Sequence, residues 1–344
     1  MTIRSKAPVR IDFAGGTTDL PAFASREGGA VVNATISRYA YCTLRPVRDD
    51  SIRIVSEDLQ RYVEAENVKA LEYDGNLDLL KAAVRRLGLE CGLEIIVRCD
   101  APPGSGTGAS ASVGVALIGM LDALRRRMGD RGRVMSRYDI AEMACSLEAE
   151  LGIIGGKQDQ FAAALGGINY MEFFPEGRVS VQRMELEPAI VHELEKHLVL
   201  CYSGESRLSG DTNDRMISAY VRGEEHVVEG LRRVKAVAEE IRNALLGGRL
   251  EALGELFEEE TAARVRLADG VQTPVMQRLC EAAREAGAVG AKICGAGGGG
   301  CLLFCAAPDR EAGVQRALIA VGGQLLSFSF DYRGLQVWQA PAEA

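Results

Sequence analysis

The feature that most restricts the fold is a glycine-rich loop in the first half of the chain. Residues 100–121 read DAPPGSGTGASASVGVALIGML, in which two prolines lead into three alternating glycines and then an amphipathic helix. Glycines let backbone amides approach a ligand closely, and a helix N-terminus offers unpaired N–H groups and a positive dipole end. The stretch therefore predicts a phosphate cradle between a strand and a helix. A serine-capped turn without a ligand is the alternative at this point.

Two well-known phosphate-binding motifs do not describe this loop. The spacing of GSGTGA satisfies GxGxxG/A, but a Rossmann site requires a second strand with an acidic end about 20 residues further on. That distance falls in ALRRRMGDRG, which lacks a strand pattern. A Walker A motif is excluded because GGKQ (155–158) lacks both the leading glycine and the Ser/Thr after the lysine. We therefore expect a third kind of nucleotide loop.

Two further clusters combine glycines with polar groups or with apolar strands. LEAELGIIGGKQDQFAAALGG (147–167) places Glu148 on a helix, and Lys157 and Asp159 just past a glycine turn, where a carboxylate could accept a proton from a hydroxyl. A helix cap followed by a solvated turn explains that stretch equally well. KICGAGGGGCLLF (292–304) has five glycines in six positions, more than a hairpin needs. Main chain lying flat against phosphates or against the first loop would account for them.

Apolar periodicity predicts two α+β domains rather than one doubly wound sheet. Strand patterns occupy 30–46 and 93–100, helical spacing recurs at 113–124 and 140–151, and a hairpin is expected around 175–177. A second block begins near 190. Its predicted elements are the strand HLVLCYSG, charged helices between 212 and 265, a helix near 275–286, and the strands AKIC, CLLFC, LSFSF and LQVW.

Composition excludes several classes of protein. A chain of 344 residues, 47% apolar and 26% charged, can bury a large core. A net charge of -8 argues against general attraction to nucleic acid or to an anionic membrane. The start has no continuous apolar signal region and no stretch approaches the roughly 18 apolar residues of a membrane span, so a cytoplasmic protein is expected. Nine cysteines without CxxC pairs and three unclustered histidines indicate reduced thiols and no zinc site.

The glycine clusters, in this order, resemble the GHMP kinases, the superfamily of galactokinase, homoserine kinase, mevalonate kinase and phosphomevalonate kinase. The resemblance implies an α+β fold with a ribosomal-protein-S5-domain-2-like domain over residues 1–188 and a ferredoxin-like domain over residues 189–344. The matching motifs are APVRIDFAGGTTDL at the N-terminus, PPGSGTGAS for the central PxxxGxGSS loop and KICGAGGGGC for the C-terminal glycine motif. RIDFAGGTTDLP, GGKQDQFAAALGGINYMEF and the lack of a GEH triplet are most similar to the heptose 7-phosphate kinase branch, with other sugar-1-kinases next.

The resemblance also implies roles for single residues. Asp159 matches the catalytic base, Arg10 the basic residue that pairs with it and stabilises the reacting oxygen, and Ser110 and Glu148 the magnesium ligands. The nucleotide is expected at Pro103, Gly104, Ser105, Gly106, Thr107, Gly108, Ala109, Ser110, Gly295, Gly297 and Gly298. The sugar is expected at Asp19, Thr17 and Thr18, with Lys157 or Arg207 meeting a distal phosphate, although Arg207 also fits a solvated loop.

Three positions depart from the family pattern. Thr107 replaces the leucine and Ala109 the first serine of GLGSS, which removes one phosphate contact. Thr17 replaces a glycine of GGGTD and faces the expected acceptor pocket.

The sequence therefore predicts an ATP- and Mg²⁺-dependent kinase of carbohydrate metabolism that phosphorylates a sugar hydroxyl, at the anomeric position of a heptose 7-phosphate. A kinase for another sugar or a cyclitol is one alternative, and a non-catalytic ligand-sensing homologue is another. The retained Arg10, Ser110, Glu148 and Asp159 weigh against the sensor. The expected partners are ATP and a small sugar or sugar phosphate, with no nucleic acid and no membrane. The sequence is compatible with a homodimer.

Overall fold

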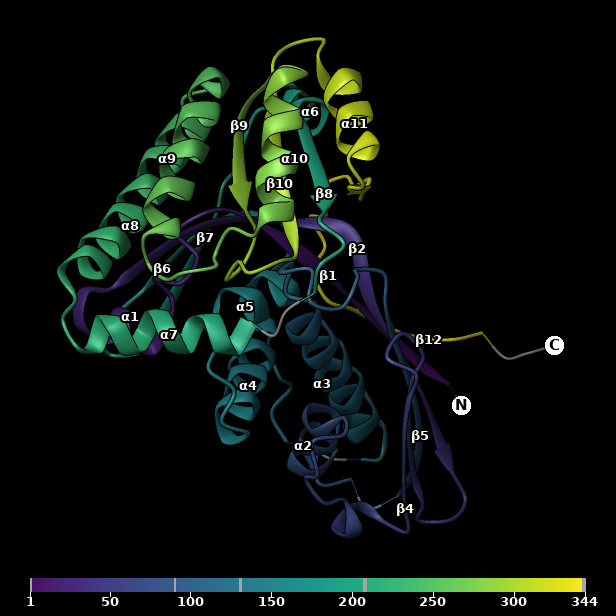
Figure 1. Ribbon diagram of the computed structural model, residues 1–344. Helices are drawn as coiled ribbons and strands as arrows, with labels where there is room; N and C mark the ends of the chain where they lie inside the picture. The colour runs from purple at the N-terminus through teal and green to yellow at the C-terminus, as the bar shows by residue number, and fades with distance from the viewer. Residues whose placement is uncertain (1, 90, 130–131, 207–208, 342–344) are drawn as a thin grey trace.

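The computed structural model describes residues 2–89, 91–129, 132–206 and 209–341. It contains two sheets, each covered by helices (Figure 1). The larger sheet has the strand order β12-β1-β2-β5-β3-β4, and β6 and β7 continue it from β2. Its strands are β1 (Ile3–Ala14), β2 (Gly29–Val47), β3 (Ile52–Ser56), β4 (Arg61–Ala65), β5 (Gly92–Cys99), β6 (Ile168–Phe173), β7 (Val179–Arg183) and β12 (Gln336–Gln339).

The first strand joins two of the three hydrophobic cores of the described residues. Ile3 and Ala7 of β1 pack in one core, whereas Val9 and Phe13 pack in another that also contains residues of the C-terminal half. The pairing of β1 with β2 shifts register between Pro8 and Arg10, where the strand passes from one core to the other. The extra residues of this irregularity lie on β2, which advances from Tyr39 to Thr35 while β1 advances from Pro8 to Arg10.

Of the helices of the first half, α3 and α5 pack on the larger sheet and α2 and α4 pack on other helices, all in the lower part of Figure 1, whereas α1 contacts α7 (Ser209–Val221). Asn67 caps a short 3-10 turn with its side chain, and Ser136 forms a capping box with Asp139 at the start of α4. The elements are α1 (Pro21–Glu27), η1 (Val68–Ala70), α2 (Asp78–Leu87), α3 (Ala109–Arg127), α4 (Arg137–Glu150) and α5 (Gln158–Leu165).

The smaller sheet is antiparallel, with the strand order β11-β8-β10-β9. Its strands are β8 (Leu198–Tyr202), β9 (Ala288–Ile293), β10 (Cys301–Ala306) and β11 (Gln324–Leu325). The helices of this half are α6 (Pro188–His197), α7 (Ser209–Val221), α8 (Glu225–Leu246), α9 (Leu253–Val265), α10 (Pro274–Glu285) and α11 (Glu311–Ala320), with the 3-10 turn η2 (Leu250–Ala252) before α9. Among these helices, α8 packs on β1 and β2 and so bridges the halves.

Most predicted elements are present, one predicted strand is wrong, and one helix was not predicted. The helices at 113–124 and 140–151 and the hairpin at 175–177 correspond to α3, α4 and β6–β7. LSFSF (326–330) is not a strand: it makes an isolated bridge from Phe330 to Ile36, and β11 ends at Leu325. Residues 311–320 form a helix, α11, that the sequence analysis did not predict.

The last strand returns to the first half of the molecule. β12 pairs with β1 in antiparallel register, so the LQVW segment belongs to the larger sheet. The expected boundary between residues 188 and 189 coincides with the first residue of α6. We propose domains of 1–188 and 189–344, with the terminal strand of the second packed on the first.

Candidate active site

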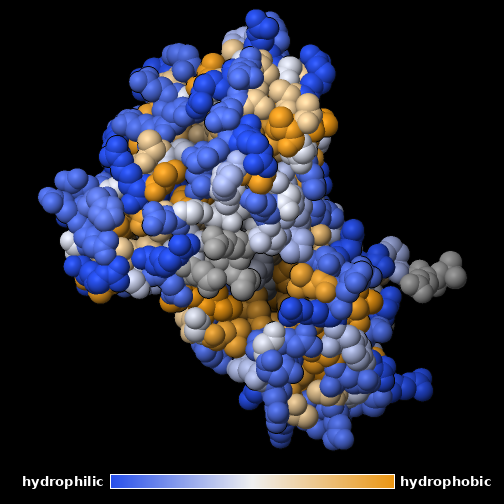
Figure 2. All heavy atoms as spheres, viewed as in Figure 1, coloured by the Kyte–Doolittle hydropathy of each residue, from blue (hydrophilic) through white to orange (hydrophobic). Residues whose placement is uncertain are grey.

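The three glycine clusters and the N-terminal loop surround one cavity of about 570 Å³. It is lined by the end of β1, the loop before α3, the segment between α4 and α5, and the loop between β9 and β10. The space-filling view shows the molecule hollowed between its two halves (Figure 2). This volume lies within the range of ordinary small-molecule sites.

The loop before α3 presents main chain rather than side chains to the cavity. Ser105 and Thr107 are each 1% exposed, and their hydroxyls bond each other at 2.7 Å. Gly108 caps α3, whose N-terminus therefore opens toward the cavity with Ala109 and Ser110 in its first turn. Backbone N–H groups at a helix N-terminus suit a phosphate.

The third glycine cluster packs directly against this loop. Gly106 has φ 72°, and a Cβ there would lie 2.5 Å from the carbonyl oxygen of Cys294. The amide of Cys301 donates to Ser105 O at 2.8 Å. The two loops thus form one wall, as the glycine content of KICGAGGGGC predicts. Of the expected nucleotide residues, the ones that do not line the cavity are Pro103, Thr107, Gly297 and Gly298.

Arg10 and Asp159 meet at the junction of the phosphate loop and the acceptor side. Arg10 Nε donates to Asp159 Oδ1 at 2.7 Å, and Nη1 donates to Gly106 O at 2.6 Å. Burial alone would lower the pKa of Arg10, but the charges of Asp159 and Asp12 outweigh it and the pKa is raised. The Asp159 side chain keeps 25% exposure, so the carboxylate stays accessible from the cavity.

Asp19 lies beside this pair and is held by the start of α5. Its Oδ2 accepts from the Gln158 amide at 3.0 Å, and the side chain packs against Gly156, where a Cβ would collide with the carboxylate. Burial raises the pKa of Asp19 to about 6, and the charges of Asp159 and Asp12 add to this against the Gln158 hydrogen bond. Asp19 is therefore a strong acceptor that has little water around it.

Glu148 adds a third carboxyl group to the same wall. It is 9% exposed, and its Oε2 accepts from Gln160 Nε2 at 2.8 Å. Burial, followed by the charge of Asp159, raises the pKa of Glu148 to about 7. A divalent cation would relieve this crowding of negative charge. Within the described ranges no group of three His, Cys, Asp or Glu side chains could hold a metal ion.

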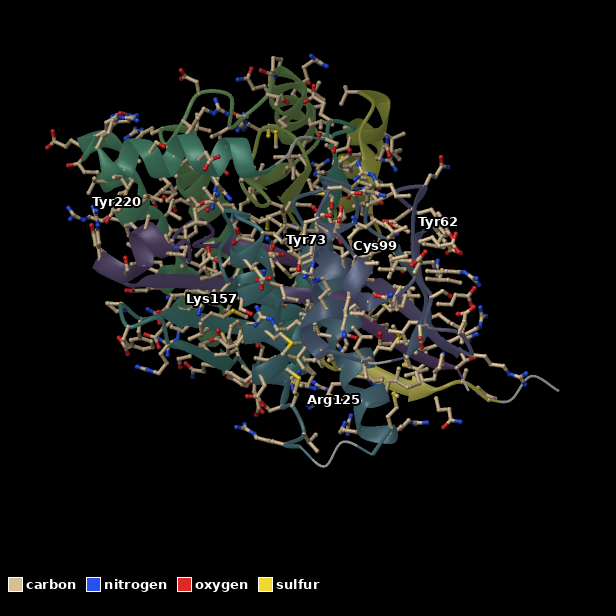
Figure 3. The ribbon with its side chains drawn as sticks, turned by 90° about the horizontal axis from the view of Figure 1, so that it is seen from below. Tyr62, Tyr73, Cys99, Arg125, Lys157 and Tyr220 are labelled. Atoms are coloured by element: carbon tan, nitrogen blue, oxygen red, sulfur yellow. The ribbon has the colours of Figure 1, made fainter. Side chains whose placement is uncertain are left out.

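Of the expected sugar residues, Thr18 and Lys157 do not line the cavity. Thr18 is fully buried, and its hydroxyl donates to Gly15 O at 2.6 Å, so it is used within the loop. Lys157, labelled in Figure 3, pairs with Glu142 at 3.2 Å and donates to Gly177 O at 3.0 Å, and it is not one of the residues that line the cavity. Arg207 lies outside the described residues.

The structure also adds residues that the sequence analysis did not single out. Gln158 and Gln160 line the cavity on either side of Asp159, because α5 begins at Gln158 rather than after a solvated turn. Asn213 and Asp214 enter from α7. The QDQ triplet carried the signal for the glutamines, whereas no motif marks the two residues of α7.

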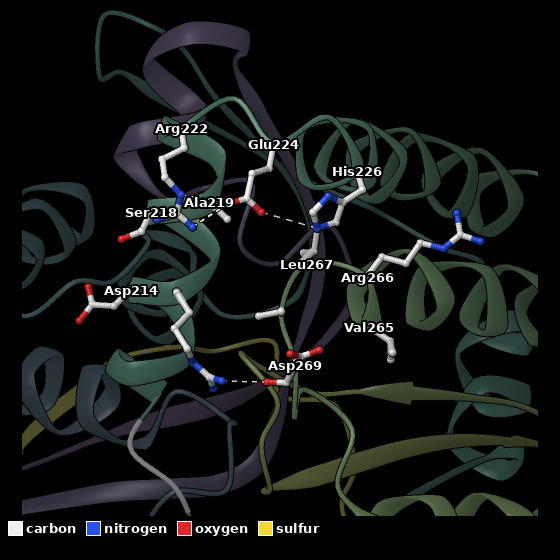
Figure 4. A pocket seen from close by; sticks show the side chains of 12 residues that line it. Asp214, Ser218, Ala219, Arg222, Glu224, His226, Val265, Arg266, Leu267 and Asp269 are labelled. Carbon is white, nitrogen blue, oxygen red and sulfur yellow. Dashed lines mark hydrogen bonds and ion pairs between the residues drawn. The ribbon is translucent and has the colours of Figure 1, made fainter.

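A second cavity, of about 670 Å³, lies on another side of α7 (Figure 4). Two of its arginines are bonded within the cavity wall. Arg222 pairs with the Glu224 carboxylate at 2.7 Å, and Arg215 donates to the backbone oxygen of Asp269 at 2.9 Å. None of the glycine loops reaches it. The Arg10–Asp159 pair lines the first cavity and not this one.

No helix within the described part of the chain is long and apolar enough to cross a membrane.

Residues 77–167 match the model of the GHMP kinases N terminal domain, and residues 236–324 match the GHMP kinases C terminal model. The chain is 31% identical over 344 residues to a D-glycero-alpha-D-manno-heptose 7-phosphate kinase of Campylobacter jejuni, covering 98% of this chain and 99% of the relative.

Solved structures agree with these matches. A D-glycero-D-manno-heptose 1-phosphate kinase from Bacteriodes thetaiotaomicron superposes with a TM-score of 0.80 at 30% identity, covering 99% of this chain and 100% of that one. A galactokinase of Lactococcus lactis in complex with galactose superposes with a TM-score of 0.74 over 98% and 95% of the two chains, and at 20% identity it shows the fold alone. Sequence matches in both halves and full-length identity above 30% establish that the chain belongs to the GHMP kinase family.

Proposed function

We propose that the protein transfers the γ-phosphoryl group of ATP to the anomeric hydroxyl of a heptose 7-phosphate. The observation that carries the proposal is the Arg10–Asp159 pair, which lies where the phosphate loop and the Asp19 loop meet. Nucleotide phosphates on the first loop and a sugar beside Asp19 would be in reach of one acid–base pair. The similarity to two heptose phosphate kinases supports the acceptor class.

The reaction would use Asp159 as the proton acceptor. As the sugar oxygen forms its bond to the γ-phosphorus, its proton passes to Asp159, and the bond from phosphorus to the leaving β-phosphate oxygen breaks. Arg10 stays charged beside this carboxylate and would stabilise the reacting oxygen. The backbone N–H groups of the loop before α3 would hold the phosphates.

We further propose that Ser110 and Glu148 hold a Mg²⁺ ion. When bound, the ion would neutralise charge on the nucleotide phosphates. Ser110 is exposed at the first turn of α3 and lines the cavity, as does Glu148. The raised pKa of Glu148 fits a site that is completed by a cation.

Glu148→Gln is expected to raise the Mg²⁺ concentration for half-maximal rate by about tenfold, because an amide is a weaker ligand than a carboxylate for a hard cation. The measurement is a Mg²⁺ titration of the initial rate, with the melting temperature recorded on the same preparation. A lower melting temperature with an unchanged Mg²⁺ dependence would make Glu148 a structural residue.

The acceptor is tested by a panel of sugars read by coupled ADP production. The panel contains heptose 7-phosphate, heptose 1-phosphate, the free heptose, hexoses and a cyclitol. Both heptose phosphates are included because the names of the two relatives give different positions for the phosphate. We expect heptose 7-phosphate to give the highest kcat/KM and the product to carry its new phosphate at the anomeric carbon, as seen by ³¹P–¹H coupling. Release of ADP with another member alone would reassign the acceptor, and no release at all would favour a ligand sensor.

A pH dependence follows from Asp19. Its pKa of about 6 means that the carboxylate is protonated below that pH, so kcat/KM for the sugar is expected to fall about tenfold per pH unit below 6. Stability moves the other way: a folded pKa above the unfolded value of 3.8 makes this group's contribution most favourable at low pH and removes it as pH rises through 6. Asp19→Asn should remove the part of both dependences centred near pH 6 and leave the part that comes from Glu148, whose pKa is raised to about 7. Identical profiles for the variant and the wild type would exclude Asp19 as their source.

A further inference from the structure

The acceptor loop, residues 15–20, contains a β-branched residue in a backbone conformation that such residues avoid. Thr17 has φ 80°, in the left-handed region, and is 6% exposed at the wall of the main cavity. A β-branched residue with this φ is an outlier, and it persists only where surrounding contacts fix it. The contacts of Thr17 therefore identify what holds the loop.

Arg264, on α9, makes those contacts. Its Nη1 donates to Thr17 Oγ1 at 3.0 Å, and its Nη2 donates to Gly16 O at 2.7 Å. Nη1 also donates to Gly295 O at 2.9 Å, on the third glycine cluster. A planar guanidinium presents these donors in a fixed geometry, which a lysine cannot reproduce. One fully buried side chain thus ties the acceptor loop to the glycine cluster.

Arg264 belongs to a group of four charges that are all 0% exposed, with Asp12, Glu260 and Lys292. Glu260 Oε1 accepts from Arg264 at 2.8 Å, and Lys292 Nζ lies 3.3 Å from Asp12 Oδ2 and 3.4 Å from Glu260 Oε1. Two carboxylates balance two cations. Burial alone would lower the pKa of Arg264, but Glu260 and Asp12 outweigh it and the pKa is raised, so the guanidinium stays charged. Removing one member would leave a buried charge without its counter-ion.

The bond from Arg264 decides which way the Thr17 hydroxyl can act. A hydroxyl has one hydrogen to donate and lone pairs to accept with. Thr17 Oγ1 accepts a hydrogen bond from the Arg264 guanidinium through one of its lone pairs. Within the described ranges it makes no second hydrogen bond. Its hydrogen therefore remains to be donated toward the cavity. Accepting from a cation in a low-dielectric site also polarises the hydroxyl and strengthens it as a donor.

We propose that Arg264 is a positioning residue for the acceptor: it holds Thr17 in the left-handed conformation and orients the Thr17 hydroxyl as a donor to a sugar oxygen. The inference rests on the proposed function in taking the ligand at this wall to be a sugar. Arg264 does not itself touch the sugar. Because it also binds Gly295 O, it fixes the acceptor loop relative to the nucleotide side.

The role of the hydroxyl is tested by Thr17→Ser and Thr17→Ala. Both variants remove the branching methyl group, so the comparison between them isolates the hydroxyl. We expect Thr17→Ala to raise the KM for the sugar about tenfold without changing the KM for ATP, and Thr17→Ser to stay within about twofold of the wild type. An unchanged sugar KM in Thr17→Ala would overturn the donor role.

The role of Arg264 is tested by Arg264→Lys, which keeps the charge and loses the fork of donors. We expect KM to rise about tenfold for both the sugar and ATP, with faster hydrogen–deuterium exchange over residues 15–20. The control is Lys81→Met. Lys81 is also buried, at 2% exposure, and pairs with Asp74 and with Asp78 at 3.1 Å on α2, outside the cavity lining. It should lower the melting temperature and leave both KM values unchanged.

If Arg264→Lys behaves like Lys81→Met, losing stability with normal KM values and normal exchange over residues 15–20, the residue is structural and the proposal is wrong. The exchange experiment needs no substrate. It therefore decides whether Arg264 fixes the loop even if the wild type phosphorylates no sugar, the result that would instead overturn the proposed function.

Discussion

Asp159→Asn is expected to lower kcat for the sugar by about 10² to 10⁴-fold and to leave nucleotide affinity nearly unchanged. The substitution keeps the size of the side chain and its hydrogen bond from Arg10, which is 2.7 Å long in the structure. It removes the group that can take the proton, together with the negative charge that pairs with Arg10. Single-turnover rates and nucleotide titrations on the same preparation separate chemistry from binding.

Glu142→Gln is a matched control for this variant. Glu142 undergoes the same change from carboxylate to amide, and it is half-exposed and paired with Lys157 away from the cavity lining. Its kcat should remain within about twofold of the wild type, because surface ion pairs contribute little. Wild-type turnover in Asp159→Asn would exclude Asp159 as the base. An equal loss of nucleotide affinity would instead make it a counter-ion of Arg10 that shapes the phosphate loop.

The glycine loops could be predicted from sequence because their function restricts local backbone geometry. Close approach of main chain to main chain requires glycine, so Gly106 against Cys294 leaves a trace in the amino-acid sequence. Short-range patterns also predicted α3 and α4, whose apolar residues recur at helical spacing. The site residues on these elements then follow from the elements themselves.

The buried charges were not predicted because they depend on contacts between distant segments. Asp12 and Lys292 lie 280 positions apart in the chain and meet only when α9 packs on both β1 and β9. Glu260 and Arg264 resemble an ordinary exposed i,i+4 pair. A signal was present nonetheless: they continue the spacing of Phe257 and Leu267, both buried, and so lie on the apolar stripe. Charges on such a stripe indicate a buried network.

Three other differences concern one strand and two side chains. β12 joins the first sheet because its partner is the edge strand β1, and pairing across the whole chain length is not encoded locally. Lys157 follows the same glycine turn as Asp159 but points to Glu142, because α5 begins one residue later and directs Asp159 inward. Thr18 points into its own loop, whereas the neighbouring Thr17 and Asp19 line the cavity.

Asp19→Ala is expected to lower kcat/KM for the sugar by about 10- to 200-fold at nearly unchanged ATP affinity. A carboxylate makes charge-assisted hydrogen bonds to hydroxyls, each worth roughly 1.5 to 3 kcal/mol, and alanine makes none. Asp19 does not act as a cap for α1, because the N-cap residue is Leu20 and no side chain caps that helix. Asp19 instead accepts from the Gln158 amide.

Gly156→Ala provides the second arm of this test, because it keeps the carboxylate and changes only its place. A Cβ at position 156 would collide with the Asp19 side chain, so the carboxylate must move or the turn before α5 must shift. If Asp19 binds the sugar, Gly156→Ala should lower kcat/KM in the same direction as Asp19→Ala while the charge is retained. In Gly156→Ala, a loss of stability comes from the collision alone. Asp19→Ala loses the hydrogen bond from the Gln158 amide, but it also removes a carboxylate whose burial is unfavourable, as its raised pKa indicates, and the second effect offsets the first. A lower melting temperature with normal acceptor kinetics in both variants would contradict the sugar-binding role of Asp19.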